Sequence, residues 1–216
     1  MATPNLITLT DPRSPTAEAF RTLRTNLMYT SVERPIQTLL LTAAADADDK
    51  STALANLAVT FAQAGHKTIL VDSDLRQPTQ HKLFGVESRR GLTNMMLEDA
   101  LMANPPLVDT GIDHLSLLPA GETPPNPADL LSSRRMDEVI GVLKARAAYV
   151  LFDAPPVLAA SDAVVLGTKV DGVLLVVRVG LTRRDRVAQA RDALEQVHAR
   201  VVGAVLTNAT RERKRY

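Results

Sequence analysis

Residues 38–52 read TLLLTAAADADDKST, an apolar run followed by a short loop and then by Lys-Ser-Thr at residues 50–52. This is the outline of a phosphate-binding P-loop, G-x-x-x-x-G-K-[ST], in which a strand and a loop lead to a helix that begins with a lysine and a hydroxyl residue. Glycines in that loop let backbone N–H groups close around phosphates. Here Ala44 and Asp49 occupy the two glycine positions. The stretch therefore predicts a nucleotide-type site with an altered phosphate loop.

The size and composition of the chain narrow the class of protein. With 216 residues, 45% of them hydrophobic, the chain suits one α/β domain over residues 1–216. Only 3% of the residues are aromatic and the net charge is +1, so we expect no nucleic-acid partner. The chain has no cysteine, which excludes disulfides and thiolate metal sites. It has neither a run of about 18 apolar residues nor a basic start before an apolar stretch, so we expect a cytoplasmic protein without a membrane span or signal peptide.

Apolar runs and helical patterns alternate along the chain. The runs predict buried strands at residues 37–42, 68–71, 115–118, 149–152, 172–177 and 201–206. Helices are predicted at residues 14–30, 51–64, 91–97, 128–146 (with a break near Ser132) and 182–199. Continuous Val/Leu/Ile runs are typical of parallel strands that are covered on both faces. The pattern predicts a three-layer α/β fold with a mostly parallel sheet between two layers of helices. The P-loop outline at residues 38–52 makes this expected fold P-loop NTPase-like.

Charged and hydroxyl residues follow three of these strands. Lys50 and Ser51 follow the first strand, Asp72 and Asp74 follow the second, and Asp153 ends a later one. Ligands bind at the carboxyl ends of such strands. There, a lysine bridges phosphates, a hydroxyl and an aspartate hold Mg²⁺, and a second aspartate accepts a proton from an attacking hydroxyl. Each aspartate alone is explained as well by a turn or a helix cap, but the set indicates nucleotide chemistry.

Five further segments carry a resemblance to a known family. They are EAFRTLRTNL (18–27), ILVDSDLRQP (69–78), GETPPNPADLL (121–131), VLFDAPPVLAASDA (150–163) and VDGVLLVVRVGLT (170–182). With these motifs in this order, almost the whole chain resembles the bacterial tyrosine kinases (BY-kinases) of capsule and exopolysaccharide systems.

The resemblance implies roles for the strand-end residues. Asp72 and Asp74 fall on the family's Walker A′ motif and Asp153 on its Walker B aspartate, which makes Lys50 and these three aspartates the candidate catalytic residues. ATP and Mg²⁺ are the implied cofactors. The implied metal ligands are Ser51, Asp72 and Asp153. The implied nucleotide contacts are Asp48, Asp49, Lys50, Ser51, Thr52 and, at the adenine, Asn208.

The helix at residues 14–30 carries a charged stripe. Glu18, Arg21 and Arg24 are three residues apart, so they share one side of the helix. Such stripes are usually solvated surface. By resemblance, the three residues match the E-x-x-R-x-x-R helix through which the family assembles into rings. The resemblance also implies a membrane polysaccharide co-polymerase or an active kinase paralogue as partner, and recruitment to the inner face of the membrane.

The phosphate loop departs from the family pattern P-G-E-G-K-S. Residues 46–51 read DADDKS, so Ala47 and Asp49 stand at glycine positions and three aspartates line the loop. Each carboxylate at ~4–6 Å would repel a triphosphate by roughly 1–4 kcal/mol. This acidic, glycine-free loop weighs against ATP and Mg²⁺. One alternative is that Lys50 pairs with Asp48 or Asp49, and another is a cation bound by Asp46, Asp48 and Asp49.

The carboxyl-terminal segment departs as well. Residues 209–216 are basic and hold one tyrosine, Tyr216, where the family has a tyrosine cluster. Tyr216 is therefore the one candidate phosphoacceptor in this tail. The basic residues indicate a solvated end, with a weak preference for an acidic partner.

Two hypotheses of different classes follow. The first is an ATP-dependent protein-tyrosine kinase that regulates capsular or exopolysaccharide polymerisation and export. The second is a pseudokinase scaffold that has lost or impaired ATP binding and acts through oligomerisation and partner binding. A chromosome-partition or septum-site ATPase needs a second lysine where this chain has Ala45. A dinucleotide oxidoreductase needs a G-x-G-x-x-G motif after a strand, and none is present.

Overall fold

The computed structural model describes residues 4–29, 34–45 and 49–209. The helices are α1 (Ile7–Thr10), α2 (Pro15–Tyr29), α3 (Lys50–Gln63), α4 (Gln80–Leu83), α5 (Leu92–Leu97), α6 (Ala100–Ala103), α7 (Pro127–Ser132), α8 (Arg134–Lys144), α9 (Asp162–Gly167) and α10 (Arg184–Gln196). The strands are β1 (Thr38–Ala43), β2 (Thr68–Asp72), β3 (Val108–Asp109), β4 (Leu115–Leu118), β5 (Tyr149–Asp153), β6 (Gly172–Arg178) and β7 (Val201–Thr207). Calls that fall on Asp46, Ala47, Asp48 or Tyr216 lie outside the described residues.

The strands form one seven-stranded sheet in the order β3-β4-β2-β5-β1-β6-β7. Every neighbouring pair is parallel except β3 and β4, which are antiparallel. β1 lies inside the sheet between β5 and β6, so its carboxyl end at Ala43 lies away from both edge strands. The prediction of a mostly parallel sheet is confirmed.

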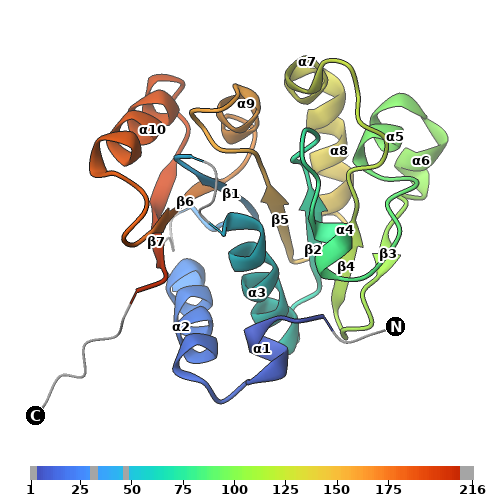
Figure 1. Ribbon diagram of the computed structural model, residues 1–216. Helices are drawn as coiled ribbons and strands as arrows, with labels where there is room; N and C mark the ends of the chain where they lie inside the picture. The colour runs from blue at the N-terminus through green and yellow to red at the C-terminus, as the bar shows by residue number, and fades with distance from the viewer. Residues whose placement is uncertain (1–3, 30–33, 46–48, 210–216) are drawn as a thin grey trace, which may run out of the picture.

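Helices cover both faces of the sheet (Figure 1). α1, α2 and α3 pack on one face, and α5, α7, α8, α9 and α10 pack on the other. Alternate residues of β1 serve the two cores, because successive side chains of a strand point to opposite faces. Leu40 belongs to one core, and Leu39 and Leu41 belong to the other. These are the three layers that the sequence predicts.

Local sequence signals place several helix ends correctly. Ser14 Oγ accepts a hydrogen bond from the N–H of Ala17 at 3.1 Å, which caps the start of α2. Gly65 has a φ of +82°, the left-handed geometry expected after the end of α3. The predicted helix over residues 128–146 is interrupted at Ser133, whose extended backbone separates α7 from α8. No helix in the described ranges is both long and apolar enough to cross a membrane.

Candidate nucleotide site

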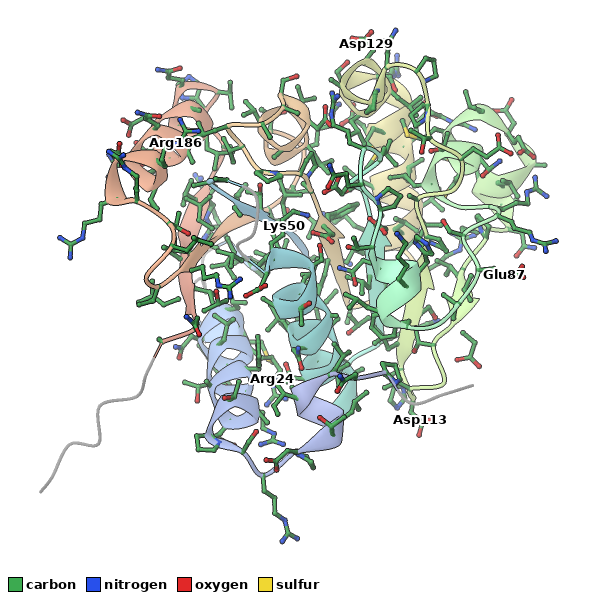
Figure 2. All side chains as sticks on the ribbon, in the orientation of Figure 1. Arg24, Lys50, Glu87, Asp113, Asp129 and Arg186 are labelled. Carbon is green, nitrogen blue, oxygen red and sulfur yellow. The ribbon has the colours of Figure 1, made fainter. Side chains whose placement is uncertain are left out.

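The sheet brings the predicted strand-end residues together. Asp72 and Asp153 are the last residues of β2 and β5, and they are register partners across the two strands. α3 begins at Lys50, directly after the loop that follows β1. Figure 2 shows Lys50 at the start of α3, near the ends of β2 and β5. Three separate segments therefore meet at one place on the carboxyl edge of the sheet, as predicted.

The ammonium group of Lys50 is the centre of this cluster. Its Nζ lies 2.9 Å from Asp74 Oδ2, 3.1 Å from Asp153 Oδ1 and 3.2 Å from Ser51 Oγ. The Asp74 and Asp153 side chains are 5% and 0% exposed, so both ion pairs are shielded from solvent. Burial by itself lowers the pKa of Lys50, but the charges of Asp153 and Asp74 outweigh it and raise the pKa overall. Lys50 is held in its charged form.

The carboxyl group of Asp72 is buried at the end of β2. Its Oδ2 accepts hydrogen bonds from the N–H groups of Thr79 and Gln80 at 3.0 and 2.9 Å. Its Oδ1 is buried and has no hydrogen-bond partner among the residues that the structure describes. Burial and then the charge of Asp153 raise the pKa of Asp72 from 3.8 to about 8. A buried carboxyl with one unpartnered oxygen is suited to receive a proton or to face a cation.

The loop residue Asp49 does not pair with Lys50, so the alternative prediction of a Lys50–Asp49 ion pair is wrong. Asp49 adopts left-handed geometry, with a φ of 54° and a ψ of 23°, at the position where the pattern has glycine. Aspartate tolerates this geometry better than most residues. Its carboxylate forms an ion pair with Arg178, at the end of β6, at 3.2 Å. Lys50 pairs instead with Asp74 and Asp153, because these carboxylates lie at the strand ends beside the start of α3.

Two further predicted nucleotide contacts, Asp49 and Thr52, line an adjacent pocket. An open pocket of about 340 Å³ is lined by Asp49 and Thr52, by residues of α1, α2 and α3, and by Thr207 at the end of β7. Asn208 follows Thr207, has a φ of 54° and donates to the carbonyl of Val179 at 3.4 Å. The end of β7 therefore lies beside the phosphate loop.

The charged stripe on α2 is not uniform. Arg21 Nη1 pairs with Glu18 Oε2 at 2.9 Å on the exposed side of the helix. Arg24 instead donates to the carbonyl of Thr60 on α3 at 2.8 Å. Figure 2 shows Arg24 between the two helices. Arg24 therefore fastens α2 to α3 within the chain, which the spacing rule did not foresee.

The oxygen donors at the site fit a magnesium ion. In the described part of the chain, no group of three or more His, Cys, Asp or Glu residues is arranged to hold a metal by itself. Mg²⁺ does not need such a group, since it commonly takes one or two carboxylates, substrate phosphates and water. Ser51 Oγ, an oxygen of Asp153 and the unpartnered Oδ1 of Asp72 match these requirements.

Sequence reasoning missed several residues that support the site. Arg76 forms a bidentate ion pair with the fully buried Asp162, at 2.6 and 3.0 Å, and so ties the loop after β2 to α9. Gln80, at the start of α4, donates to Ser51 and Asp153. Arg76 and Asp162 lie inside the quoted family segments, which was the available signal. Arg178 lies inside the quoted segment 170–182 as well, whereas Gln80 lies outside all of the quoted segments and no local pattern marks it.

The fold and the strand-end cluster define a protein of the P-loop NTPase fold class. The septum site-determining protein MinD of Pyrococcus horikoshii, solved with Mg-ADP, shares this fold with a TM-score of 0.66 over 79% of this chain and 69% of its own. At 22% identity, that likeness shows the fold alone.

Two closer matches show the family. The kinase domain of the Escherichia coli tyrosine kinase ETK is 30% identical, with a TM-score of 0.92, over 100% of this chain and 85% of its own. Tyrosine-protein kinase YwqD of Bacillus subtilis (strain 168) is 42% identical over 204 residues, which are 94% of this chain and 85% of YwqD. The chain belongs to the bacterial tyrosine kinase family. No protein-family model matches it.

Proposed function

We propose that this chain acts as a single BY-kinase-like domain, over residues 1–216, that regulates capsular or exopolysaccharide polymerisation and export by ATP-dependent tyrosine phosphorylation. The observation that carries the proposal is the charged lysine held between two buried carboxylates at the strand ends. This arrangement keeps Lys50 in place for nucleotide phosphates. When a nucleotide binds, the ammonium group of Lys50 would exchange carboxylate partners for phosphate oxygens. Membership of the tyrosine kinase family supports the same activity.

The residues of the site have distinct roles in this proposal. Lys50 bridges the phosphates, and Ser51, Asp72 and Asp153 would hold Mg²⁺, which when bound neutralises phosphate charge. Asp74 fixes Lys50 through the 2.9 Å ion pair. Asp72 takes part through its buried Oδ1, which has no hydrogen-bond donor among the described residues and is therefore open to the metal.

The surroundings of the site complete the proposal. Thr52 lines the pocket beside the start of α3, and Asn208 follows Thr207, another lining residue. Both would contact the nucleoside, while Tyr216 is the proposed phosphoacceptor. The chain would assemble with copies of itself through Glu18 and Arg21 on α2. A membrane polysaccharide co-polymerase or an active kinase paralogue would hold it at the cytoplasmic face of the membrane.

The second candidate function, a pseudokinase scaffold, is favoured by Asp49. Its side chain is half exposed at the loop before α3, where phosphates must approach, and its charge is shared with Arg178. A carboxylate at this place repels a triphosphate more strongly than a glycine does. A chain that cannot bind ATP would act through oligomerisation and partner binding.

Calorimetric titration with Mg-ATP separates the two functions. The native chain is compared with an Asp49→Gly/Ala47→Gly variant, which restores two glycines. The kinase proposal expects micromolar binding by the native chain, tighter binding by the variant, and phosphotyrosine at Tyr216 after incubation with Mg-ATP. Binding by the variant alone would assign the scaffold function instead.

A further inference from the structure

Gln80 is a buried polar residue at the centre of the site that none of the motifs includes. It is the first residue of α4, and its side chain is fully shielded from solvent. A buried amide needs hydrogen-bond partners to offset its loss of water, and Gln80 finds them at Nε2, while its Oε1 has none among the described residues. The partners of Gln80 are the reason to assign it a role.

The amide of Gln80 bridges two segments that are distant in sequence. Its Nε2 donates to the carbonyl oxygen of Ser51 at 3.0 Å and to Asp153 Oδ2 at 2.8 Å. Both partners are acceptors only, so the NH₂ group must face them. The backbone N–H of Gln80 donates to Asp72 Oδ2 at 2.9 Å. One residue therefore touches the start of α3 and the ends of β2 and β5.

These contacts fix the carboxylate of Asp153 in one orientation. Its Oδ1 accepts from Lys50 Nζ at 3.1 Å, and its Oδ2 accepts from Gln80. A carboxylate that is held at one oxygen still turns about its terminal torsion, which is broad for aspartate. Held at both oxygens, it cannot turn without breaking a buried hydrogen bond. The plane of Asp153, and with it the place of Lys50, depends on Gln80.

The chemistry of an amide suits this position. Two carboxylates, those of Asp74 and Asp153, already pair with one lysine here, so a neutral donor satisfies Asp153 without adding charge. An apolar side chain would leave both the Ser51 carbonyl and Asp153 Oδ2 without this donor, and unpaired buried acceptors are costly. A glutamate would add a further carboxylate to the cluster.

We propose that Gln80 is the positioning residue of the nucleotide site, which locks Asp153 to the start of α3 so that Lys50 and Ser51 stand ready for phosphate. This inference rests on the proposed function. Gln80 acts through Asp153 and Ser51 and is not itself assigned a contact with nucleotide. Misplacing a reacting group by about 1 Å costs roughly 10²-fold in rate, which sets the scale of the expected effect.

The test compares Gln80→Met with Gln37→Met. Gln37 is a matched control, because its Nε2 also donates to two acceptors, the carbonyls of Lys144 and Ala147 at 2.9 and 3.0 Å, near the start of β1 and away from the site. We expect Gln80→Met to lower kcat for tyrosine phosphorylation about 10- to 100-fold, while the KM for ATP changes less than about threefold. Gln37→Met is expected to change neither constant, even where it lowers the melting temperature equally. An unchanged kcat in Gln80→Met overturns the inference.

A second measurement needs no nucleotide. A double-mutant cycle on unfolding joins Gln80→Met with Asp153→Asn, and a parallel cycle joins Gln37→Met with Asp153→Asn. The inference expects coupling of about fivefold or more in the unfolding equilibrium constant for the first pair and additivity for the second. Additive losses in the first cycle overturn it.

If the native chain fails to bind ATP, the kinase proposal fails separately. The kinetic comparison then moves to the Asp49→Gly/Ala47→Gly background, and the unfolding cycles are unaffected.

Discussion

At the scale of single residues, Asp72 shows how the site works against the stability of the fold. Its carboxyl group is buried at the end of β2 with Oδ1 unpartnered, and burial followed by the charge of Asp153 raises its pKa to about 8. At pH values between the ordinary pKa of 3.8 and the raised pKa of about 8, the folded chain therefore keeps a proton on Asp72 that the unfolded chain has lost. In that window stability falls as the pH rises. A residue kept at such a cost is expected at a functional site.

The variant Asp72→Asn should remove this cost. The asparagine keeps an oxygen for the N–H groups of Thr79 and Gln80 but carries no charge to ionise. In metal-free buffer we expect the variant to be more stable than the native chain by roughly 2 kcal/mol at pH 8, and by less at pH 5. Urea unfolding at the two pH values measures both differences. An advantage that stays constant or shrinks as the pH rises would contradict the raised pKa.

At the scale of elements, α1 is attached to the helix that opens the nucleotide site. Asn56 of α3 accepts hydrogen bonds at Oδ1 from the N–H and the hydroxyl of Thr8, at 3.1 and 2.9 Å. Both residues are buried, and Leu6 beside them belongs to the core on this face of the sheet. α1 has four residues, too few to be a stable helix alone. Its structure therefore depends on this contact.

Replacing Asn56 tests that dependence. Asn56→Ala leaves the two donors of Thr8 buried and unpaired, so we expect a loss of about 2 kcal/mol in unfolding free energy. Hydrogen exchange at the amides of α1 should become faster, while that of β5 follows only the global change. Thr8→Val is the milder comparison, because it removes the hydroxyl and keeps the backbone N–H. Equal effects of the two variants would mean that the backbone bond contributes nothing.

The sequence predicts those elements whose signal is local. Long apolar runs and helical periodicity mark β1, α3 and β5, and single residues such as Ser14 and Gly65 mark helix ends. α1 and β3 were missed because four and two residues carry no readable period. α9 was missed because it begins at Asp162, whose burial is explained by Arg76 rather than by any pattern nearby.

The same limit applies to the site. Lys50 and the three aspartates were found because parallel strands present their carboxyl ends at one edge. Gln80 was not found, because its partner Asp153 is 73 positions away and nothing near Gln80 signals that contact. Asp49 and Arg178 are 129 positions apart, so their pairing also required the folded sheet.

At the scale of the whole molecule, the proposed assembly of copies of the chain depends on which residues of α2 remain on its surface. Glu18 and Arg21 pair with each other on the exposed side of the helix, and Arg21 also donates to the carbonyl of Pro12. Arg24 is bound to the carbonyl of Thr60 and packs α2 against α3. Two residues of the stripe are thus available to a second copy, and the third serves the fold of one copy.

This division predicts that the variants separate assembly from stability. Glu18→Ala/Arg21→Ala should shift the chain toward monomer in sedimentation velocity and change the unfolding free energy by less than about 0.5 kcal/mol, because an exposed ion pair contributes little. Arg24→Ala should cost about 1–3 kcal/mol, because it leaves the Thr60 carbonyl without its charged donor between two helices. Arg191→Ala on α10, which removes an exposed arginine paired with Asp192, is the control and should change neither property. If the double variant sediments like the native chain, α2 is excluded as the assembly surface. If Arg24→Ala leaves the unfolding free energy unchanged, the contact of Arg24 with Thr60 does not stabilise the fold.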